Sequence, residues 1–257
     1  MAKKSFSNKS RKRSKNMQKR ISKLEEQIEP VLKTFEQRQH DYVCPAAATY
    51  IGCPLPYSTP KVWMASDLYP TLQDGSTTSF QNGTVRLGDK ITFKSLRLKG
   101  EVRATDSAGP TAEKSNIVRL MCVLFPDSVV GNTGAEICSK VLQQYPTAAP
   151  SVYSSVDSCY SSYKNVIDLQ NTIPMQNYKV LHDRTYLVNN PRAIPNGEFR
   201  AKFDIKINFK KGLVMQYDKF GSDAPSLNQI VFIALSDSTI TPHPDISLVS
   251  RAKYMDA

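Results

Sequence analysis

One segment constrains the fold of this chain more than any other: apolar and polar residues alternate without a break from position 199 to position 209. Successive side chains of a β-strand point to opposite faces, so this alternation predicts a half-buried strand. The residues expected on its buried face are Phe199, Ala201, Phe203, Ile205, Ile207 and Phe209. The opposite face carries Arg200, Lys202 and Lys206 around Asp204. This basic face is either a solvated outer surface or a contact surface.

Further segments show strand patterns of the same kind, namely 89–104, 116–125, 178–188, 212–217, 229–236 and 246–256. Within the first of them the alternation slips at Lys94 and Ser95, which predicts a β-bulge or a bend. The segments 116–125 and 229–236 are apolar on both faces, as central or doubly covered strands are. Many strands joined by long loops favour an all-β fold of the sandwich type, the jelly roll included.

The chain is long enough to bury a sizeable core. Its 257 residues, of which 40% are hydrophobic, fit either one all-β domain or two small domains. The longest uninterrupted apolar run, Ile230 to Leu235, is far too short to cross a bilayer. We therefore expect no membrane insertion.

Positive charge is concentrated at the N-terminus. The first twenty residues contain no anion and nine cations, which are Lys3, Lys4, Lys9, Arg11, Lys12, Arg13, Lys15, Lys19 and Arg20. The other 237 residues hold 25 Lys and Arg against 23 Asp and Glu, so they are close to neutral. A segment this polar cannot bury enough surface to order itself, which predicts a disordered arm at 1–20. Its natural partner is a polyanion, such as nucleic acid.

The same arm has two further implications for localisation. It has no apolar stretch behind it, so we do not expect a secretory signal. The Arg11-Lys12-Arg13 run inside a Lys-rich stretch is typical of a nuclear-import signal or a nucleic-acid-binding patch.

A short helix and a connector are expected after the arm. Apolar residues recur at alternating spacings of four and three, at Met17, Ile21, Leu24, Ile28, Val31 and Phe35. This spacing predicts an amphipathic helix, and Pro30 should kink or end it near Glu29. The helix packs either on its own domain or against a neighbouring subunit. Four prolines among small residues in 43–61 then favour an extended connector.

The expected organisation is therefore an arm at 1–20, a helix and connector at 21–60, and a folded body at 61–257. Within the body, the Ser-, Tyr- and Pro-rich segment 127–177 is a long insertion, which we expect on the outer surface. It opens with a helical pattern at 134–145, where Ile137, Val141, Leu142 and Tyr145 share one face.

Enzymatic and metal-binding signatures are absent from the sequence. It has no nucleophile-elbow, zincin, P-loop or dinucleotide-binding motif. His182 and Asp183 are adjacent in an expected strand and so point to opposite faces, while His243 and Asp245 lie in a Pro-rich loop as weak hydrolase candidates. The run Ser236-Asp237-Ser238 favours a strand-ending turn. We expect no enzyme, no metal and no cofactor.

The cysteines show no pattern of a disulfide framework or a zinc site. They are odd in number, scattered and without a CxxC pair: Cys44, Cys53, Cys122, Cys138 and Cys159. We expect reduced, mostly buried thiols.

The order of these features resembles the capsid proteins of circular single-stranded DNA viruses related to the circoviruses. The segments that carry the resemblance are the basic arm, "RLGDKITFKSLRLKG", "VRLMCVLFPD", "YKVLHDRTYLV", "FRAKFDIKINFKKG", "NQIVFIALSDS" and the terminal "RAKYMDA". The segments after the arm span roughly Arg86 to Ala257, about two thirds of the chain. The Lys-Val-Leu-x-Asp-Arg-Thr strand, followed closely by a basic alternating strand, is its most specific part.

This resemblance implies a single jelly roll that assembles into a small icosahedral shell, with about sixty copies of the chain. It implies that the arm points inward onto a single-stranded DNA genome. Localisation would be the virion and, during assembly, the host nucleus, with a nuclear-import receptor and a cell-surface attachment factor as further partners. The basic face of Arg200, Lys202 and Lys206 would then lie toward the shell interior or an intersubunit contact.

Two alternatives remain open from the sequence. A capsid protein of a small single-stranded RNA virus would show the same arm, because phosphate contacts do not distinguish DNA from RNA. A cellular nucleic-acid-binding β-domain should instead alternate aromatic residues with Lys or Arg on an exposed strand face. In 199–209 the aromatic residues share the apolar face, which favours the capsid hypothesis.

Overall fold

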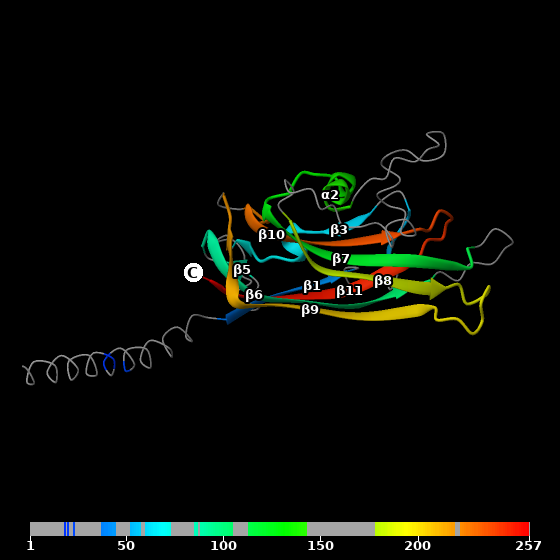
Figure 1. The fold of residues 1–257 in the computed structure, drawn as a ribbon, viewed down its shortest axis with the longest axis horizontal. Coiled ribbons are helices and arrows are strands. Elements are labelled where there is room, and N and C mark those ends of the chain that lie inside the picture. Colours follow the sequence, from blue (N-terminus) through cyan, green and yellow to red (C-terminus); the bar gives the residue numbers. More distant parts are fainter. Residues whose placement is uncertain are drawn as a thin grey trace, which may run out of the picture.

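The computed structural model describes residues 18, 20, 23, 37–44, 52–57, 60–72, 85–86, 88–104, 113–142, 178–218 and 222–256. Almost all regular structure in these ranges is antiparallel β-strand (Figure 1). The strands are β1 (Gln37–Cys44), β2 (Cys53–Pro54), β3 (Lys61–Trp63), β4 (Thr71–Leu72), β5 (Val85–Arg86), β6 (Lys90–Arg103), β7 (Ser115–Asp127), β8 (Lys179–Asn189), β9 (Arg200–Gln216), β10 (Leu227–Ser236) and β11 (Asp245–Asp256). The helices are the short 3-10 helix η1 (Ala65–Asp67) and the α-helix α2 (Gly134–Val141).

The principal strands form two layers. One has the order β1-β11-β6-β9, and in the other β10 lies between β3 and β7, with β8 beyond β7. The layers are joined between β9 and β10 through a single residue pair, Gln216 with Leu227, so the sheet turns a corner there. Figure 1 shows the two groups of strands one above the other. This arrangement is that of a β-sandwich.

The main core fills the space between the layers. Phe203 of β9 and Phe232 of β10 meet there with ring centroids 6.3 Å apart, and Trp63 of β3 packs 5.2 Å from Phe232. Tyr186 of β8 lies 6.4 Å from Phe203. Aromatic rings from both layers therefore interlock, and burial of their apolar surface is the main force that holds the layers together.

The strands expected from sequence are confirmed, with two adjustments. The register between β6 and β9 shifts between Phe93 and Ser95, where the bulge is expected, and this shift turns Phe93 and Leu96 to the same buried side. The segments 199–209 and 212–217 are one continuous strand, β9, with Gly212 at a φ of 78° inside it. Phe199 lies just before β9 and is exposed, so its expected place in the core is wrong.

Strand β1 was not expected from the sequence. It pairs antiparallel with β11 from Gln37 to Cys44, so the sheet already includes residues before the expected body boundary at 61. Its inward positions include His40, whose Nε2 lies 2.7 Å from the Ser66 carbonyl oxygen, and Arg38, which forms an ion pair with Asp256. Because polar side chains occupy inward positions, no apolar alternation marks this strand.

Helix α2 covers the outer face of the layer that contains β10 and β7 (Figure 1). It begins with a capping box, in which Thr133 and Glu136 each satisfy a backbone N–H of the other. Ile137 and Val141 are fully buried against Met121 of β7 and Ile233 of β10. The expected helix is thus confirmed but ends earlier, at Val141; Tyr145 lies outside the described residues.

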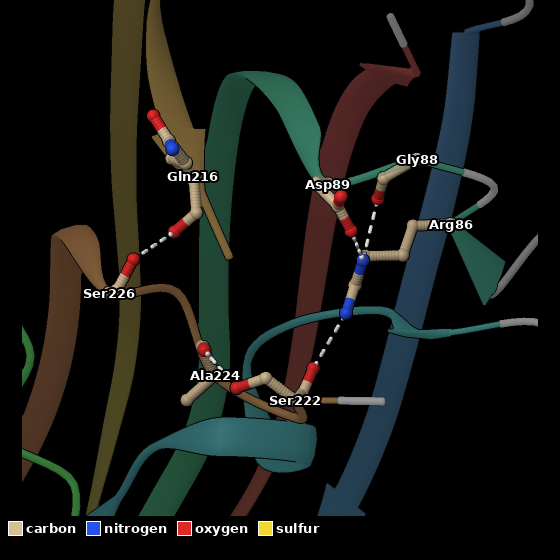
Figure 2. A network of polar contacts seen from close by, with 7 residues as sticks. All are labelled: Arg86, Gly88, Asp89, Gln216, Ser222, Ala224 and Ser226. Carbon is tan, nitrogen blue, oxygen red and sulfur yellow. Dashed lines mark hydrogen bonds and ion pairs between the residues drawn. The ribbon is translucent and has the colours of Figure 1, made fainter. Parts of the chain in front are cut away.

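A buried arginine joins two loops at one end of the molecule (Figure 2). The Arg86 side chain is fully buried, and it donates hydrogen bonds to the carbonyl oxygens of Gly88 at 2.5 Å and Ser222 at 2.8 Å. Its guanidinium also lies 3.8 Å from the centroid of the Tyr217 ring. Arg86 therefore fastens the loop after β9 to the segment that precedes β6.

The basic arm and the amphipathic segment at 17–35 lie almost entirely outside the described residues. Gln18, Arg20 and Lys23 are described, and all three are helical and exposed. Within the described ranges, no helix is both long and apolar enough to span a membrane.

Candidate functional site

The polar outer face of the β1-β11-β6-β9 layer carries the main concentration of charge in the described body. Residues directly opposite each other in a sheet share a face, so the strand register sets the pattern. One row across the sheet reads Asp41, Arg251, Arg97 and Lys206, and the next reads Val43, Val249, Lys99 and Asp204. Across the whole face the cations are Arg97, Lys99, Arg103, Arg200, Lys202, Lys206, Arg251 and Lys253, and the anions are Asp41, Glu101, Asp204 and Asp245. We call this surface the charged face.

Ion pairs organise part of the charged face. Arg97 donates two hydrogen bonds to Asp204, at 2.8 and 2.7 Å, and Lys206 adds a contact of 3.5 Å to the same carboxylate. The hydrogen bond from Arg97 is the main reason that the pKa of Asp204 is lowered to about 2. At the edge of the sheet, Arg251 likewise donates two hydrogen bonds to the Asp41 carboxylate, at 2.8 and 2.7 Å.

Cations of neighbouring strands lie opposite one another on the charged face. Arg251 lies directly opposite Arg97, and Arg97 lies directly opposite Lys206. Like charges at opposite positions of an antiparallel pair are destabilising. Ion pairs offset this repulsion, because Arg251 binds Asp41 while Arg97 and Lys206 both contact Asp204.

Three lysines of the charged face have no anionic partner among the described residues. Lys99, Lys202 and Lys253 are exposed, and no ion pair within the described body involves them. A lysine ammonium on a flexible stem is a suitable contact for a phosphate at variable distance. These three residues are the best candidates for direct contact with a polyanion.

Of the site residues expected from sequence, Arg200, Lys202 and Lys206 lie together on the charged face, while all arm cations except Arg20 lie outside the described residues. The sequence reasoning did not assign the cations that β6 and β11 contribute, namely Arg97, Lys99, Arg251 and Lys253. Their strand patterns were visible, but only the register of distant strands brings them beside β9.

The first strand of the layer that carries the charged face is β1. Strand β1 is the edge strand of this layer, and it follows the arm and the amphipathic segment in the sequence. The described part of this layer therefore begins at Gln37, the first residue of β1.

Of the two weak hydrolase candidates, His243 lies in the loop after β10 and Asp245 begins β11, where it pairs with Arg103. The hydrogen bonds around His243 do not form a catalytic triad. Ser238 Oγ donates to Glu113 Oε2 at 2.8 Å and also lies 3.0 Å from His243 Nδ1. In a catalytic triad the carboxylate contacts the histidine, whereas here Glu113 contacts the serine directly. Strand β10 ends at Ser236, as expected, and Asp237 accepts a hydrogen bond from the backbone N–H of Ile117 in β7.

Glu113 is the centre of this loop network. It also accepts hydrogen bonds from Thr239, from both the backbone N–H at 2.7 Å and the hydroxyl at 2.9 Å, and from Asn116 at 2.6 Å. Partial burial raises the pKa of Glu113, but the hydrogen bonds outweigh it and leave the pKa below its usual value. The arrangement ties two loops together, and we assign it a structural role.

His182 and Asp183 do not act together. Asp183 accepts two hydrogen bonds from Arg119 of β7, at 2.8 and 2.5 Å, while burial lowers the pKa of His182. Within the described residues, no group of three or more His, Cys, Asp or Glu side chains could hold a metal ion.

Comparisons with known proteins give little information. No protein-family profile matches the chain, and no curated protein is similar to it. Among solved structures, one titled "Crystal structure of 60-mer BFDV Capsid Protein" aligns with 85% of this chain and 88% of its own, at 9% sequence identity and a TM-score of 0.25. A likeness at that TM-score does not establish a shared fold.

Proposed function

We propose that this chain is a viral capsid protein: a jelly-roll subunit that assembles into a small icosahedral shell and packages single-stranded DNA through its basic N-terminal arm. The observation that carries the proposal is the strand order. The charge distribution is the second support.

The strand pairings match those of a rolled hairpin. β1 pairs with β11, β3 with β10, β6 with β9 and β7 with β8, so the first principal strand pairs with the last, the second with the second last, and so on. Rolling such a hairpin brings β11 beside β6 and β10 beside β7, and these pairs are also present. Two four-stranded layers in this order are the pattern of a jelly roll, a fold that is common in viral capsids.

A shell gives the charged face and the arm a common purpose. Both would face the interior, where the arm cations and the three free lysines Lys99, Lys202 and Lys253 meet phosphates without reading bases. A capsid protein needs such sequence-independent contacts because it must hold whatever sequence its genome contains. The layer covered by α2 would then face outward, together with the 127–177 insertion, which we propose for host attachment.

The alternative function, a cellular β-domain that binds nucleic acid by stacking bases on aromatic rings, has little support in the described residues. Such a module needs aromatic rings on the exposed face of its strands. The outward positions that the register gives for β1, β11, β6 and β9 hold no aromatic residue, and Phe203 of β9 points into the core. The exposed Phe199, just before β9, has its ring centroid 5.3 Å from the Arg200 guanidinium. Between DNA and RNA the charged face offers no distinction, and single-stranded DNA is proposed on the sequence resemblance.

The test compares three forms of the full chain: intact, lacking residues 2–20, and with the nine arm cations replaced by Gln at unchanged length. Electron microscopy of the intact protein with single-stranded DNA should show uniform closed shells. Both altered forms should keep a folded body and lose packaged DNA. The slope of log binding constant against log salt concentration should become shallower by up to about 6, because each of the nine lost phosphate contacts contributes about 0.7. Only soluble monomers under all conditions, or equal DNA content in the three forms, would contradict the proposal.

A further inference from the structure

Two cysteine thiols meet at the edge of the β1-β11-β6-β9 layer. Cys44 is the last residue of β1 and pairs with Leu248 of β11, while Cys53 is in β2 and pairs with Ile246. Both short strands run antiparallel to β11, whose other edge is occupied by β6. Cys44 and Cys53 therefore lie on the same side of β11, at positions two residues apart.

The two thiols also share a face. Leu248 and Ile246 are both buried, and residues opposite them in the register point the same way, into the core. Cys44 is only 4% exposed, whereas Cys53 is half-buried. The Cys44 thiol is close enough to raise the pKa of Cys53, and both thiols are free.

The spacing is compatible with a covalent bond. Two positions along a strand correspond to a Cα separation of about 6.6 to 6.8 Å, at the upper end of the range that disulfides bridge. The backbone before Cys53 approaches β11 closely, because a Cβ added to Gly52 would lie 2.5 Å from the Asp245 Oδ1 atom. A small inward movement of this segment would bring the thiols to bonding distance.

We propose that Cys44 and Cys53 form an intrachain disulfide when the protein meets an oxidising small-molecule disulfide such as glutathione disulfide. This inference does not depend on the proposed capsid function. The bond would staple the chain between the two cysteines to the edge of the sheet where β1 ends. It would mark passage of the protein from a reducing to an oxidising environment.

The reaction takes two exchange steps. The Cys53 thiolate, the more accessible of the two, attacks one sulfur of glutathione disulfide, whose S–S bond breaks and releases one glutathione thiolate. The Cys44 thiolate then attacks the Cys53 sulfur of the mixed disulfide and displaces the second glutathione. Two protein thiols thereby lose two protons and two electrons, and glutathione disulfide gains them as it becomes two glutathione thiols.

The surroundings of Cys53 make this exchange slow at neutral pH. Burial, followed by the contact with Cys44, raises the pKa of Cys53 to about 11; the charge of Asp245 adds to this increase and Lys61 opposes it. Tyr42 is the other titratable neighbour, and burial raises its pKa as well. The thiolate fraction is therefore small, and the pair stays reduced until an oxidant is supplied.

The test uses the full chain, reduced and then incubated with glutathione disulfide. Peptide mapping without reductant should recover Cys44 joined to Cys53, with Cys122 and Cys138 still free because both are fully buried. The variant Cys159→Ser should form the same link, and Cys53→Ser should not. In Cys44→Ser the glutathione adduct should remain on Cys53, because the resolving thiol is absent.

Three results would overturn the inference: a link from Cys53 to Cys159, a stable glutathione adduct on Cys53 of the natural sequence, or two thiols that remain free after prolonged oxidation. A second readout is thermal unfolding. The oxidised protein should have a Tm several degrees above that of the reduced protein, and addition of dithiothreitol should reverse the difference. Cys53→Ser should show no such change.

Discussion

The two outer faces of the sandwich each carry a bidentate Arg–Asp pair in opposite surroundings. On the face covered by α2, Arg119 binds Asp183 with 5% of the arginine side chain exposed. On the charged face, Arg97 binds Asp204 with nearly the same geometry, but 48% of the arginine side chain is exposed. The same kind of pair thus lies in a low-dielectric setting on one face and in contact with water on the other.

Burial decides what each pair does. A buried charge that loses its partner cannot be solvated, so the Arg119 pair is structurally indispensable even though its formation gains little net stability. An exposed pair is screened by water and salt and contributes little to folding. The covered face therefore stabilises the sandwich, and the charged face can exchange its contacts with a partner. Each of the following predictions tests that division.

The largest effect is expected from Asp183→Asn. This change leaves the buried Arg119 guanidinium without its anion, and it should lower the free energy of unfolding by about 3 kcal/mol. Urea unfolding followed by tryptophan fluorescence measures this through Trp63, which is buried in the core. The matched control, Asp204→Asn, should leave the midpoint almost unchanged. Equal effects of the two substitutions would contradict the division between the faces.

A second large effect is expected where α2 covers β7 and β10. Ile137→Ala creates a cavity in a fully buried cluster, which should cost about 2 to 4 kcal/mol of stability. The control is Val130→Ala, because Val130 is exposed just before the helix. Binding of single-stranded DNA by the folded fraction should be the same in both variants. A loss of binding in Ile137→Ala beyond the unfolded fraction would mean that the covered face also takes part.

The division between the faces also explains what could be predicted from the sequence. Strands β6, β7, β9 and β10 could be predicted from their own residues, because the apolar positions in each sequence are the positions that the fold buries. The alternation in β9, the slip in β6 and the apolar runs of β7 and β10 are the patterns that show this. Strand β1 could not be found in this way, since its inward positions include His40, which contacts the Ser66 carbonyl through Nε2, and Arg38, which pairs with Asp256. A polar residue buried with its partner has no hydrophobic signal.

Only part of the candidate site could be predicted from the sequence, because its residues come from several strands. Arg200, Lys202 and Lys206 lie on one strand, so their shared face follows from a period of two. Arg251 and Arg97 are 154 positions apart in the sequence but directly opposite each other in the sheet. Their proximity depends on strand order and register, which no local pattern determines.

A moderate effect on binding, without loss of stability, is expected from the free lysines of the charged face. The triple variant Lys99→Gln, Lys202→Gln and Lys253→Gln should reduce the salt slope of single-stranded DNA binding by up to about 2, since each lost phosphate contact removes about 0.7. Titrations in the form without residues 2–20 isolate this term from the arm.

The control for that variant replaces three exposed lysines outside the charged face, Lys114, Lys140 and Lys179, with Gln. Net charge changes equally in both triple variants, so a non-local charge effect would lower both slopes alike. Such a result would remove the charged face as a binding surface and leave the arm alone in that role.

The smallest effect concerns the acid response of the Arg97–Asp204 pair. The pKa of Asp204 is lowered to about 2 in the folded protein, chiefly by the hydrogen bond from Arg97, whereas an unfolded Asp titrates near 3.9. A lowered carboxyl pKa contributes stability that is present above the unfolded value and is lost as the pH falls toward the folded value. The difference in unfolding free energy between the natural sequence and Asp204→Asn should therefore be constant above about pH 5 and shrink between about pH 4 and pH 2. Because the pair is exposed, the whole difference should also diminish in 1 M salt, and a difference that persists there would mean that the pair is shielded from solvent.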